Sequence, residues 1–226
     1  MGFSMDILKK FGIETDDESI YQMAFTHGSY SAKYDLDYNY ERLEFLGDSV
    51  LSVIVSGYLY NKYPEFEEGK LTKIRANYVC QNALIFYSHE LGLTDNLRFS
   101  EDEGHMTESE VLSITADIFE SFLGAVFIDQ GMDFAKKFVS DNIFKYIDDE
   151  RVFFRDYKSA IKEYGDANEV EIEYKILQEL GVPHDKLFVI SIWVDGKEIG
   201  VGKGKNKKEA EQAAAKIASD KLKLVF

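Results

Sequence analysis

Hydrophobic residues recur at helical spacing through most of the first 147 residues of the chain. The pattern is clearest in four segments, separated by glycine, asparagine or acidic residues: 41–60, 71–90, 108–128 and 132–147. A repeat near 3.6 residues predicts amphipathic helices. The first part of the chain is therefore predicted to be almost entirely α-helical.

The pattern changes after a charged run at 148–151. Five segments follow, a helical one, three alternating ones and an alanine-rich helical one: 157–164, 171–177, 187–194, 198–204 and 207–221. Alternation predicts strands, and Asp195-Gly196 predicts a tight turn between the last two. The predicted fold class is an all-α domain followed by a small α+β domain of order α-β-β-β-α. We expect the first domain at 1–148, a linker at 149–153 and the second domain at 154–226.

The charge of the chain divides at nearly the same place. The net charge is −15, but residues 1–150 hold 12 basic and 28 acidic side chains, whereas residues 151–226 hold 14 and 13. Phosphate affinity comes from lysine and arginine, so the whole-chain charge taken alone argues against nucleic acid as a partner. In residues 151–226 the basic and acidic side chains nearly balance, so the argument against nucleic acid does not apply to this part of the chain.

Composition narrows the class of protein. Hydrophobic residues make up 45% of the chain, and there are only two prolines and one cysteine. A globular protein fits, whereas a disulfide scaffold or a multi-cysteine zinc module does not. The longest uncharged apolar stretch, 49–61, is shorter than the roughly 18 residues that a membrane span needs, and the N-terminus carries no export or lipidation signal. We expect a soluble, cytoplasmic protein with no membrane partner.

Three acids lie close together in the segment 41–51. At about 100° per residue, Glu41, Glu44 and Asp48 share one narrow helix face. For three acids at this spacing alone, the simpler interpretation is a solvated acidic stripe.

A second pair of acids changes that interpretation. Asp117 and Glu120 lie one turn apart in the segment 116–128, which is otherwise apolar nearly all round and holds no lysine or arginine. Unpaired carboxylates in a core helix are costly, so a metal cation shared with acids from another helix is the cheapest way to neutralise them. Oxygen ligands favour Mg²⁺, with Mn²⁺ able to substitute.

These segments also carry a family resemblance. Residues 41–51 resemble the signature of the ribonuclease III family, and Asp117-x-x-Glu120 with Gly124 is similar to its second acidic motif. Shorter motifs at 26–30, 68–69 and 75–77 follow in the family's order, so the resemblance covers 15–147. It implies a nuclease domain with Asp48 and Glu120 as catalytic acids. It also implies that the metal ligands are Glu44, Asp117 and Glu120. Two further acids of the cleft are implied, Glu41 and Glu68.

Other nucleophiles and bases fit less well. A lone histidine such as His27 is more often a structural hydrogen-bonding group, and a metal-activated water does not need it as a base. Cys80 has no activating neighbour in sequence and is expected to pack. Ser49 lacks the glycine pattern of a nucleophile elbow.

Lysines collect in the second part where the last strand meets the last helix. Taken alone, the lysine run at 203–208 fits a solvated surface equally well. Together with the α-β-β-β-α order and Gly181-Val182-Pro183-His184 in the first hairpin, residues 154–224 resemble a double-stranded RNA-binding domain. The resemblance implies recognition of duplex shape, and the matching contact positions are Lys158, Ser159, Glu163, Pro183, His184, Lys205, Asn206, Lys207 and Lys208.

The predicted function is Mg²⁺-dependent hydrolysis of double-stranded RNA to 5′-phosphate and 3′-hydroxyl ends, in processing of rRNA precursors and mRNA. The resemblance implies a homodimer, and no small-molecule cofactor is expected. Two alternatives stay open: a non-catalytic double-stranded RNA-binding protein, and a structural acidic helical protein with an incidental basic tail.

Overall fold

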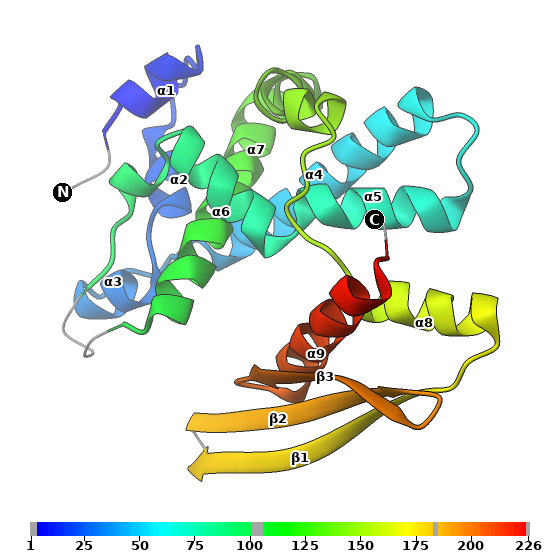
Figure 1. The fold of residues 1–226 in the computed structure, drawn as a ribbon. Coiled ribbons are helices and arrows are strands. Elements are labelled where there is room, and N and C mark those ends of the chain that lie inside the picture. Colours follow the sequence, from blue (N-terminus) through cyan, green and yellow to red (C-terminus); the bar gives the residue numbers. More distant parts are fainter. Residues whose placement is uncertain (1–3, 101–105, 183–184, 225–226) are drawn as a thin grey trace. The chain divides into compact units, whose positions relative to one another are not determined.

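The computed structural model describes residues 4–100, 106–182 and 185–224. Contacts divide the chain into two compact units, Met1–Phe154 and Arg155–Phe226 (Figure 1).

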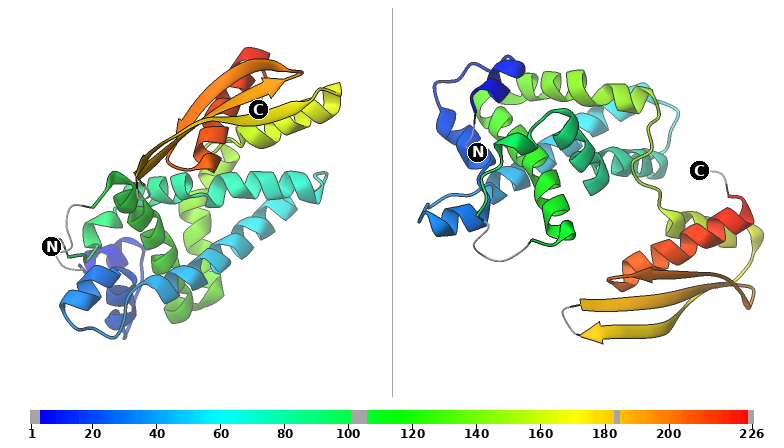
Figure 2. Two further views of the ribbon diagram at one scale, coloured as in Figure 1. Left: turned by 90° about the horizontal axis from the view of Figure 1, so that it is seen from below. Right: turned by 60° about the vertical axis from the view of Figure 1, so that its left-hand side comes forward.

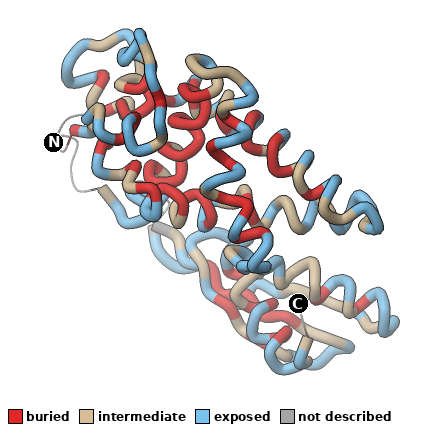
Figure 3. The backbone as a smooth tube through the Cα atoms, turned by 90° about the horizontal axis from the view of Figure 1, so that it is seen from above, coloured by how far each residue is buried: buried red, intermediate tan, exposed pale blue. Residues whose placement is uncertain are grey.

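The first unit is all-helical, as predicted. Its elements in chain order are α1 (Asp6–Lys10), α2 (Glu18–Ala24), α3 (Gly28–Lys33), α4 (Glu41–Lys62), α5 (Glu68–Val79), α6 (Gln81–Glu90), the 3₁₀ turn η1 (Thr94–Asn96) and α7 (Glu108–Asp148). The long helices α4 and α7 make the most extensive packing contact in the unit. Many of the buried positions lie on these two helices, and Figure 3 colours the buried stretches of backbone red.

Two helix boundaries depend on single residues. The segment 71–90, predicted as one helix, is two helices, because Cys80 takes an extended conformation with ψ of 159° between α5 and α6. Gly131, with φ of 82°, interrupts α7 between the two helices predicted at 108–128 and 132–147. Glycine reaches this left-handed region at little cost, so the break falls there.

The core of the first unit is rich in aromatic rings. Phe122 lies within 6 Å, between ring centroids, of Phe11, Tyr21, Phe25 and Phe138. By length and composition, α4 and α7 are also apolar enough to cross a membrane. They instead pack on each other and share this core, which is the arrangement of core helices in a globular protein.

The end of the first unit is held in place by one asparagine. The Asn77 Oδ1 atom accepts hydrogen bonds from the backbone N–H groups of Phe153 and Phe154, at 2.7 and 2.8 Å, and its Nδ2 donates to the Arg151 carbonyl at 2.8 Å. The Arg151 guanidinium lies 3.8 Å from the centre of the Phe86 ring. Much of the segment predicted as a linker at 149–153 is thus packed on the first unit. We call these contacts the Asn77 clasp.

The second unit has the predicted order α-β-β-β-α. Its elements are α8 (Tyr157–Asn168), β1 (Ile172–Val182), β2 (Asp185–Val194), β3 (Lys197–Gly204) and α9 (Lys207–Leu222). The strands form an antiparallel sheet of order β1-β2-β3, and both helices lie on one of its faces (Figure 2). At Gly202 a Cβ atom would lie 2.2 Å from the backbone nitrogen of Ala214, so α9 rests directly on β3.

Candidate metal centre and RNA-binding surface

Two glycines bring α4 and α7 into backbone contact. A Cβ atom at Gly47 would lie 1.7 Å from the carbonyl oxygen of Glu120, and one at Gly124 would lie 2.2 Å from that of Leu43. Neither position can accept a side chain without moving a helix. Glu44 and Glu120 each lie within one turn of a crossing glycine, so the crossing brings acids of the two motifs together.

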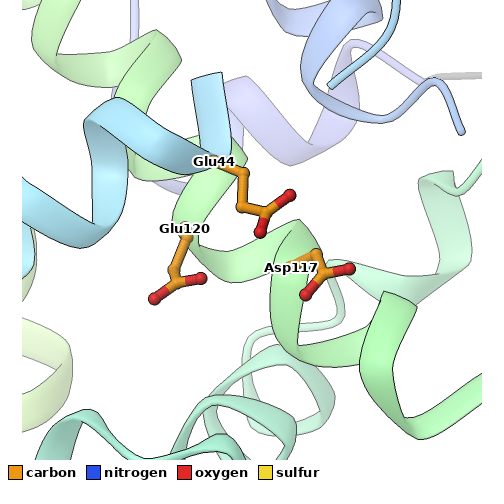
Figure 4. A group of neighbouring side chains, drawn as sticks. All are labelled: Glu44, Asp117 and Glu120. Atoms are coloured by element: carbon orange, nitrogen blue, oxygen red, sulfur yellow. The ribbon is translucent and has the colours of Figure 1, made fainter. Parts of the chain in front are cut away.

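The result is a cluster of three carboxylates. Glu44 from α4 and Asp117 and Glu120 from α7 each offer an oxygen atom, and these atoms all lie within 4.8 Å of one another (Figure 4). Glu120 is the most enclosed of the three, with 9% of its surface exposed. Among the ion pairs of the described residues, none neutralises any of these acids.

The electrostatics of the cluster are those of uncompensated negative charge. Burial, followed by repulsion from Asp48, Glu44 and Asp117, raises the pKa of Glu120 to about 8. Burial, followed by repulsion from Asp117 and other acids, raises the pKa of Glu44 to about 7. Each carboxylate therefore makes its neighbours harder to ionise.

Asp117 differs because two neighbours favour its charge. Burial raises its pKa, while a hydrogen bond from Tyr40 and the nearby His27 act in the opposite direction. The Tyr40 hydroxyl donates to Asp117 Oδ2 at 2.9 Å. Sequence reasoning did not single out Tyr40, although it directly precedes the first acidic motif.

Asp48 and Glu41 lie beside the cluster rather than within it. Both are exposed. The charge of Asp48 contributes to the raised pKa of both Glu44 and Glu120, and that of Glu41 to the raised pKa of Glu44. The structure thus brings five of the six predicted acids into one electrostatic neighbourhood.

Glu68 does not join this neighbourhood within one chain. It begins α5, where its carboxylate accepts a hydrogen bond from Thr72 at 3.0 Å. Glu44 lies in the first turn of α4, and α5 starts only after α4 has ended at Lys62. At 1.5 Å per residue, Glu44 and Lys62 are about 27 Å apart along α4. The start of α5, where Glu68 lies, therefore follows the end of α4 that is remote from the cluster.

The donor set of the cluster suits a hard divalent cation. Carboxylate oxygens are the ligands of Mg²⁺, which binds through a few carboxylates and keeps several waters. A cation also removes the repulsion that raises the pKa of Glu44 and Glu120. The residues present therefore fit the metal that the sequence predicts.

His27 and Cys80 have structural surroundings. His27 precedes α3, and its Nδ1 accepts a hydrogen bond from the Ser29 backbone N–H at 3.1 Å, which caps the helix. Cys80 is partly buried against the core, and burial raises the pKa of its thiol. A raised pKa disfavours the thiolate that a nucleophile needs.

The predicted RNA-contact residues that the structure describes in the second unit fall into two groups, one at the start of α9 and one on α8. Lys205, Lys207 and Lys208 are exposed around the start of α9, and the Asn206 side chain caps that helix by accepting from the Glu209 N–H at 2.9 Å. The lysines thus surround a helix N-terminus, which adds positive potential.

Two of the predicted contact residues on α8 already interact with other side chains of the second unit. Lys158 forms an ion pair with Glu211 of α9, and the Ser159 hydroxyl donates to the helix cap Asp156 at 2.7 Å. Glu163 is exposed. Pro183 and His184 lie outside the described residues.

Comparison with known proteins identifies both units. Residues 17–147 match the family model described as Ribonuclease-III-like, and residues 157–222 match the double-stranded RNA binding motif. "Ribonuclease 3" of Geobacillus sp. (strain WCH70) is 40% identical over 225 residues, which span 97% of this chain and 91% of the relative. The chain belongs to the ribonuclease III family. "Ribonuclease 3" of Anoxybacillus flavithermus is 43% identical over 218 residues, covering 94% of this chain and 91% of the relative.

A solved structure supports the same assignment for the first unit. The nuclease domain of ribonuclease III from Campylobacter jejuni is 33% identical, with a TM-score of 0.56, and the match covers 63% of this chain and 97% of that domain. The present chain is therefore a double-strand-specific endoribonuclease, composed of a helical nuclease unit with a candidate metal centre and a double-stranded RNA-binding unit.

Proposed function

We propose that the enzyme hydrolyses phosphodiester bonds of double-stranded RNA in a Mg²⁺-dependent reaction that leaves 5′-phosphate and 3′-hydroxyl ends. The observation that carries the proposal is the cluster of Glu44, Asp117 and Glu120, whose charges lack a partner cation among the ion pairs of the described residues. Mn²⁺ offers the same coordination chemistry and is expected to substitute.

The acids fall into two groups in this proposal, the ligands of the cation and the acid beside them. Glu44, Asp117 and Glu120 hold the cation, and the exposed Asp48 lies beside them, where water and substrate reach it. When bound, the metal polarises a phosphate oxygen and lowers the pKa of a coordinated water. Because the pKa of Glu44 is about 7 and that of Glu120 about 8, metal binding near neutral pH has to displace protons from the site.

The second unit supplies affinity for the substrate. Its lysines at the start of α9 provide the phosphate contacts, whereas the acidic first unit repels RNA in the absence of a cation. Recognition by duplex shape fits substrates such as rRNA precursors and structured mRNA. We expect the enzyme to act on these transcripts in the cytoplasm.

We further infer that the enzyme is a homodimer. Phe45 of α4 is 78% exposed, although it is aromatic, and it borders a groove of about 630 Å³ whose lining includes Met23, Leu46 and Ile128. An exposed ring beside an apolar groove gives a surface that a second copy can cover by two-fold symmetry. Sedimentation at micromolar concentration should show a dimer, and Phe45→Glu should shift it to monomer. A monomeric wild type would contradict this inference.

The cleavage reaction itself tests the proposed function. The wild type with Mg²⁺ should cut a perfect RNA duplex, and the products should accept a 5′ label from polynucleotide kinase only after phosphatase treatment. Glu120→Gln, which removes the charge at equal size, should abolish cleavage and keep duplex binding. Glu108→Gln, which changes an exposed glutamate of the same helix, is the matched control and should cut normally. Turnover by the Glu120 variant in Mg²⁺ would refute the site.

A further inference from the structure

Tyr40 contacts both halves of the acidic cluster. It stands immediately before α4, and only 4% of its surface is exposed. Its carbonyl oxygen accepts hydrogen bonds from the backbone N–H groups of Leu43 and Glu44, both at 2.9 Å. Its hydroxyl reaches across to α7 and donates to Asp117 Oδ2 at 2.9 Å. One residue thus links the first turn of α4 to an acid of the other helix.

The position of Tyr40 is itself well determined. Its backbone N–H donates to the carbonyl of Thr26 at 2.9 Å, and its ring centroid lies 5.8 Å from that of His27. The cap on α3 in turn holds the His27 ring, through the hydrogen bond from Ser29 to Nδ1. Neither the backbone nor the ring of Tyr40 can move without disturbing neighbouring segments.

Asp117 is distinguished from its two partners by this contact. Among the hydrogen bonds of the described residues, none is donated by a side chain to the carboxylate of Glu44 or Glu120. Asp117 has one oxygen, Oδ2, occupied by a protein donor, which leaves Oδ1 for another ligand. A hydrogen bond at one oxygen also fixes the rotation of the carboxyl group about its own axis.

We propose that Tyr40 is a positioning residue of the metal centre, whose hydroxyl holds the Asp117 carboxylate in the orientation that binds the divalent cation. The inference rests on the proposed metal-dependent function of the cluster. Ligating carboxylates are commonly hydrogen-bonded by a second group, and removal of that group typically weakens metal affinity or activity by about 10–100-fold. Tyr40 serves Asp117 in this way and touches neither metal nor substrate.

The test is Tyr40→Phe, which removes only the hydroxyl and keeps the packed ring. Mn²⁺ is titrated into the full-length protein without RNA, by calorimetry and by electron paramagnetic resonance of the free ion. We expect its dissociation constant to rise about 10-fold in the variant. In cleavage assays the Mg²⁺ concentration at half-maximal rate should rise similarly, while the KM for duplex RNA stays unchanged.

The chain provides a closely matched control. The Tyr21 hydroxyl, also in a buried side chain, donates to Asp129 Oδ2 at 2.7 Å. Asp129 lies on α7, twelve residues beyond Asp117 and about 18 Å further along the helix. Tyr21→Phe therefore removes the same kind of bond from the same helix, away from the cluster, and should leave Mn²⁺ affinity unchanged.

The outcomes separate the role of Tyr40 from the metal site itself. Asp117→Asn is titrated in parallel and should lose most Mn²⁺ affinity. Loss in Asp117→Asn with wild-type affinity in Tyr40→Phe would overturn the positioning role and leave the metal site intact. Wild-type affinity in both would overturn the proposed metal centre. Equal weakening in the Tyr40 and Tyr21 variants would show a general loss of packing and would also overturn the positioning role.

Discussion

Replacing Glu120 with glutamine should stabilise the metal-free enzyme at pH 8 and change its stability little at pH 5. In the folded protein, burial and three neighbouring carboxylates raise the pKa of Glu120 from 4.5 to about 8. The unfolded chain lacks both causes, so its Glu120 titrates near the ordinary value. The folded state consequently binds the proton more tightly than the unfolded state.

The sign of the pH dependence follows from this difference. A group whose pKa is raised on folding contributes stability below about pH 4.5, and that contribution is lost as pH rises through about 8. One pKa unit corresponds to about 1.4 kcal/mol, so the rise from 4.5 to about 8 lets Glu120 account for on the order of 5 kcal/mol across this window. Glu44, with a pKa of about 7, acts in the same direction. The two contributions share one repulsion and do not add.

The assay is urea unfolding in EDTA at pH 5, 6, 7 and 8, followed by far-ultraviolet circular dichroism. The free energy of unfolding of the wild type should fall with pH, and that of Glu120→Gln should fall less. The single tryptophan, Trp193, lies in the second unit, so its fluorescence is an internal control that the substitution should not affect. Saturating Mg²⁺ should stabilise the wild type much more than the variant.

Two results would refute this reasoning. If the wild type and Glu120→Gln lose stability in parallel from pH 5 to pH 8, the cluster does not carry unpaired charge in the folded state. If the exposed control Glu108→Gln flattens the pH dependence equally, the effect comes from overall charge rather than from the buried site.

Three further predictions concern the helix crossing, the lysines and the Asn77 clasp. Gly47→Ala should lower the free energy of unfolding by about 3 kcal/mol or more and weaken Mn²⁺ binding. Gly57→Ala on the same helix, where a Cβ atom meets nothing within 4 Å, should do neither. Thermal unfolding measures the stability, and calorimetry measures the Mn²⁺ affinity. Replacing Lys205, Lys207 and Lys208 with alanine should weaken duplex binding and flatten the plot of log K against log salt by up to about 0.9 per lost contact, while the maximal cleavage rate persists at low salt. Asn77→Ala removes three hydrogen bonds and should lower the free energy of unfolding by about 2 kcal/mol. It should also expose the peptide bond after Arg151 to trypsin, and unchanged digestion would contradict the clasp.

Local patterns predicted most of the fold, and single residues account for the differences. The 3.6-residue and two-residue periods identified the long helices and the three strands because each element buries one regular face. The break at Cys80 escaped prediction because it involves neither glycine nor proline, only one residue in an extended conformation. The short helices α1, α2 and α3 were not predicted individually, since one or two turns are too short to show a period.

The site was predictable up to the limit of helix geometry. Spacing along one helix placed Glu41, Glu44 and Asp48 on a common face, but it could not say which of them meets the second motif. That choice depends on where Gly47 and Gly124 let the helices cross, which is a tertiary contact. For the same reason Tyr40 was missed and the ion pair of Lys158 with Glu211 was not foreseen. Glu68 was assigned to the cleft by the resemblance rather than by spacing, and within one chain it lies at the start of α5.

The Asn77 clasp determines what kind of joint connects the two units. Phe153 and Phe154 are hydrogen-bonded to Asn77, and Asp156 already caps α8. The connection is therefore a short linker rather than a long flexible one. Between these two held segments stands a single residue, Arg155, and one residue of extended chain spans only about 3.5 Å. Releasing the clasp would lengthen the connection without inserting a residue. The length of the linker therefore depends on the Asn77 side chain of α5 as well as on the number of residues between the two units.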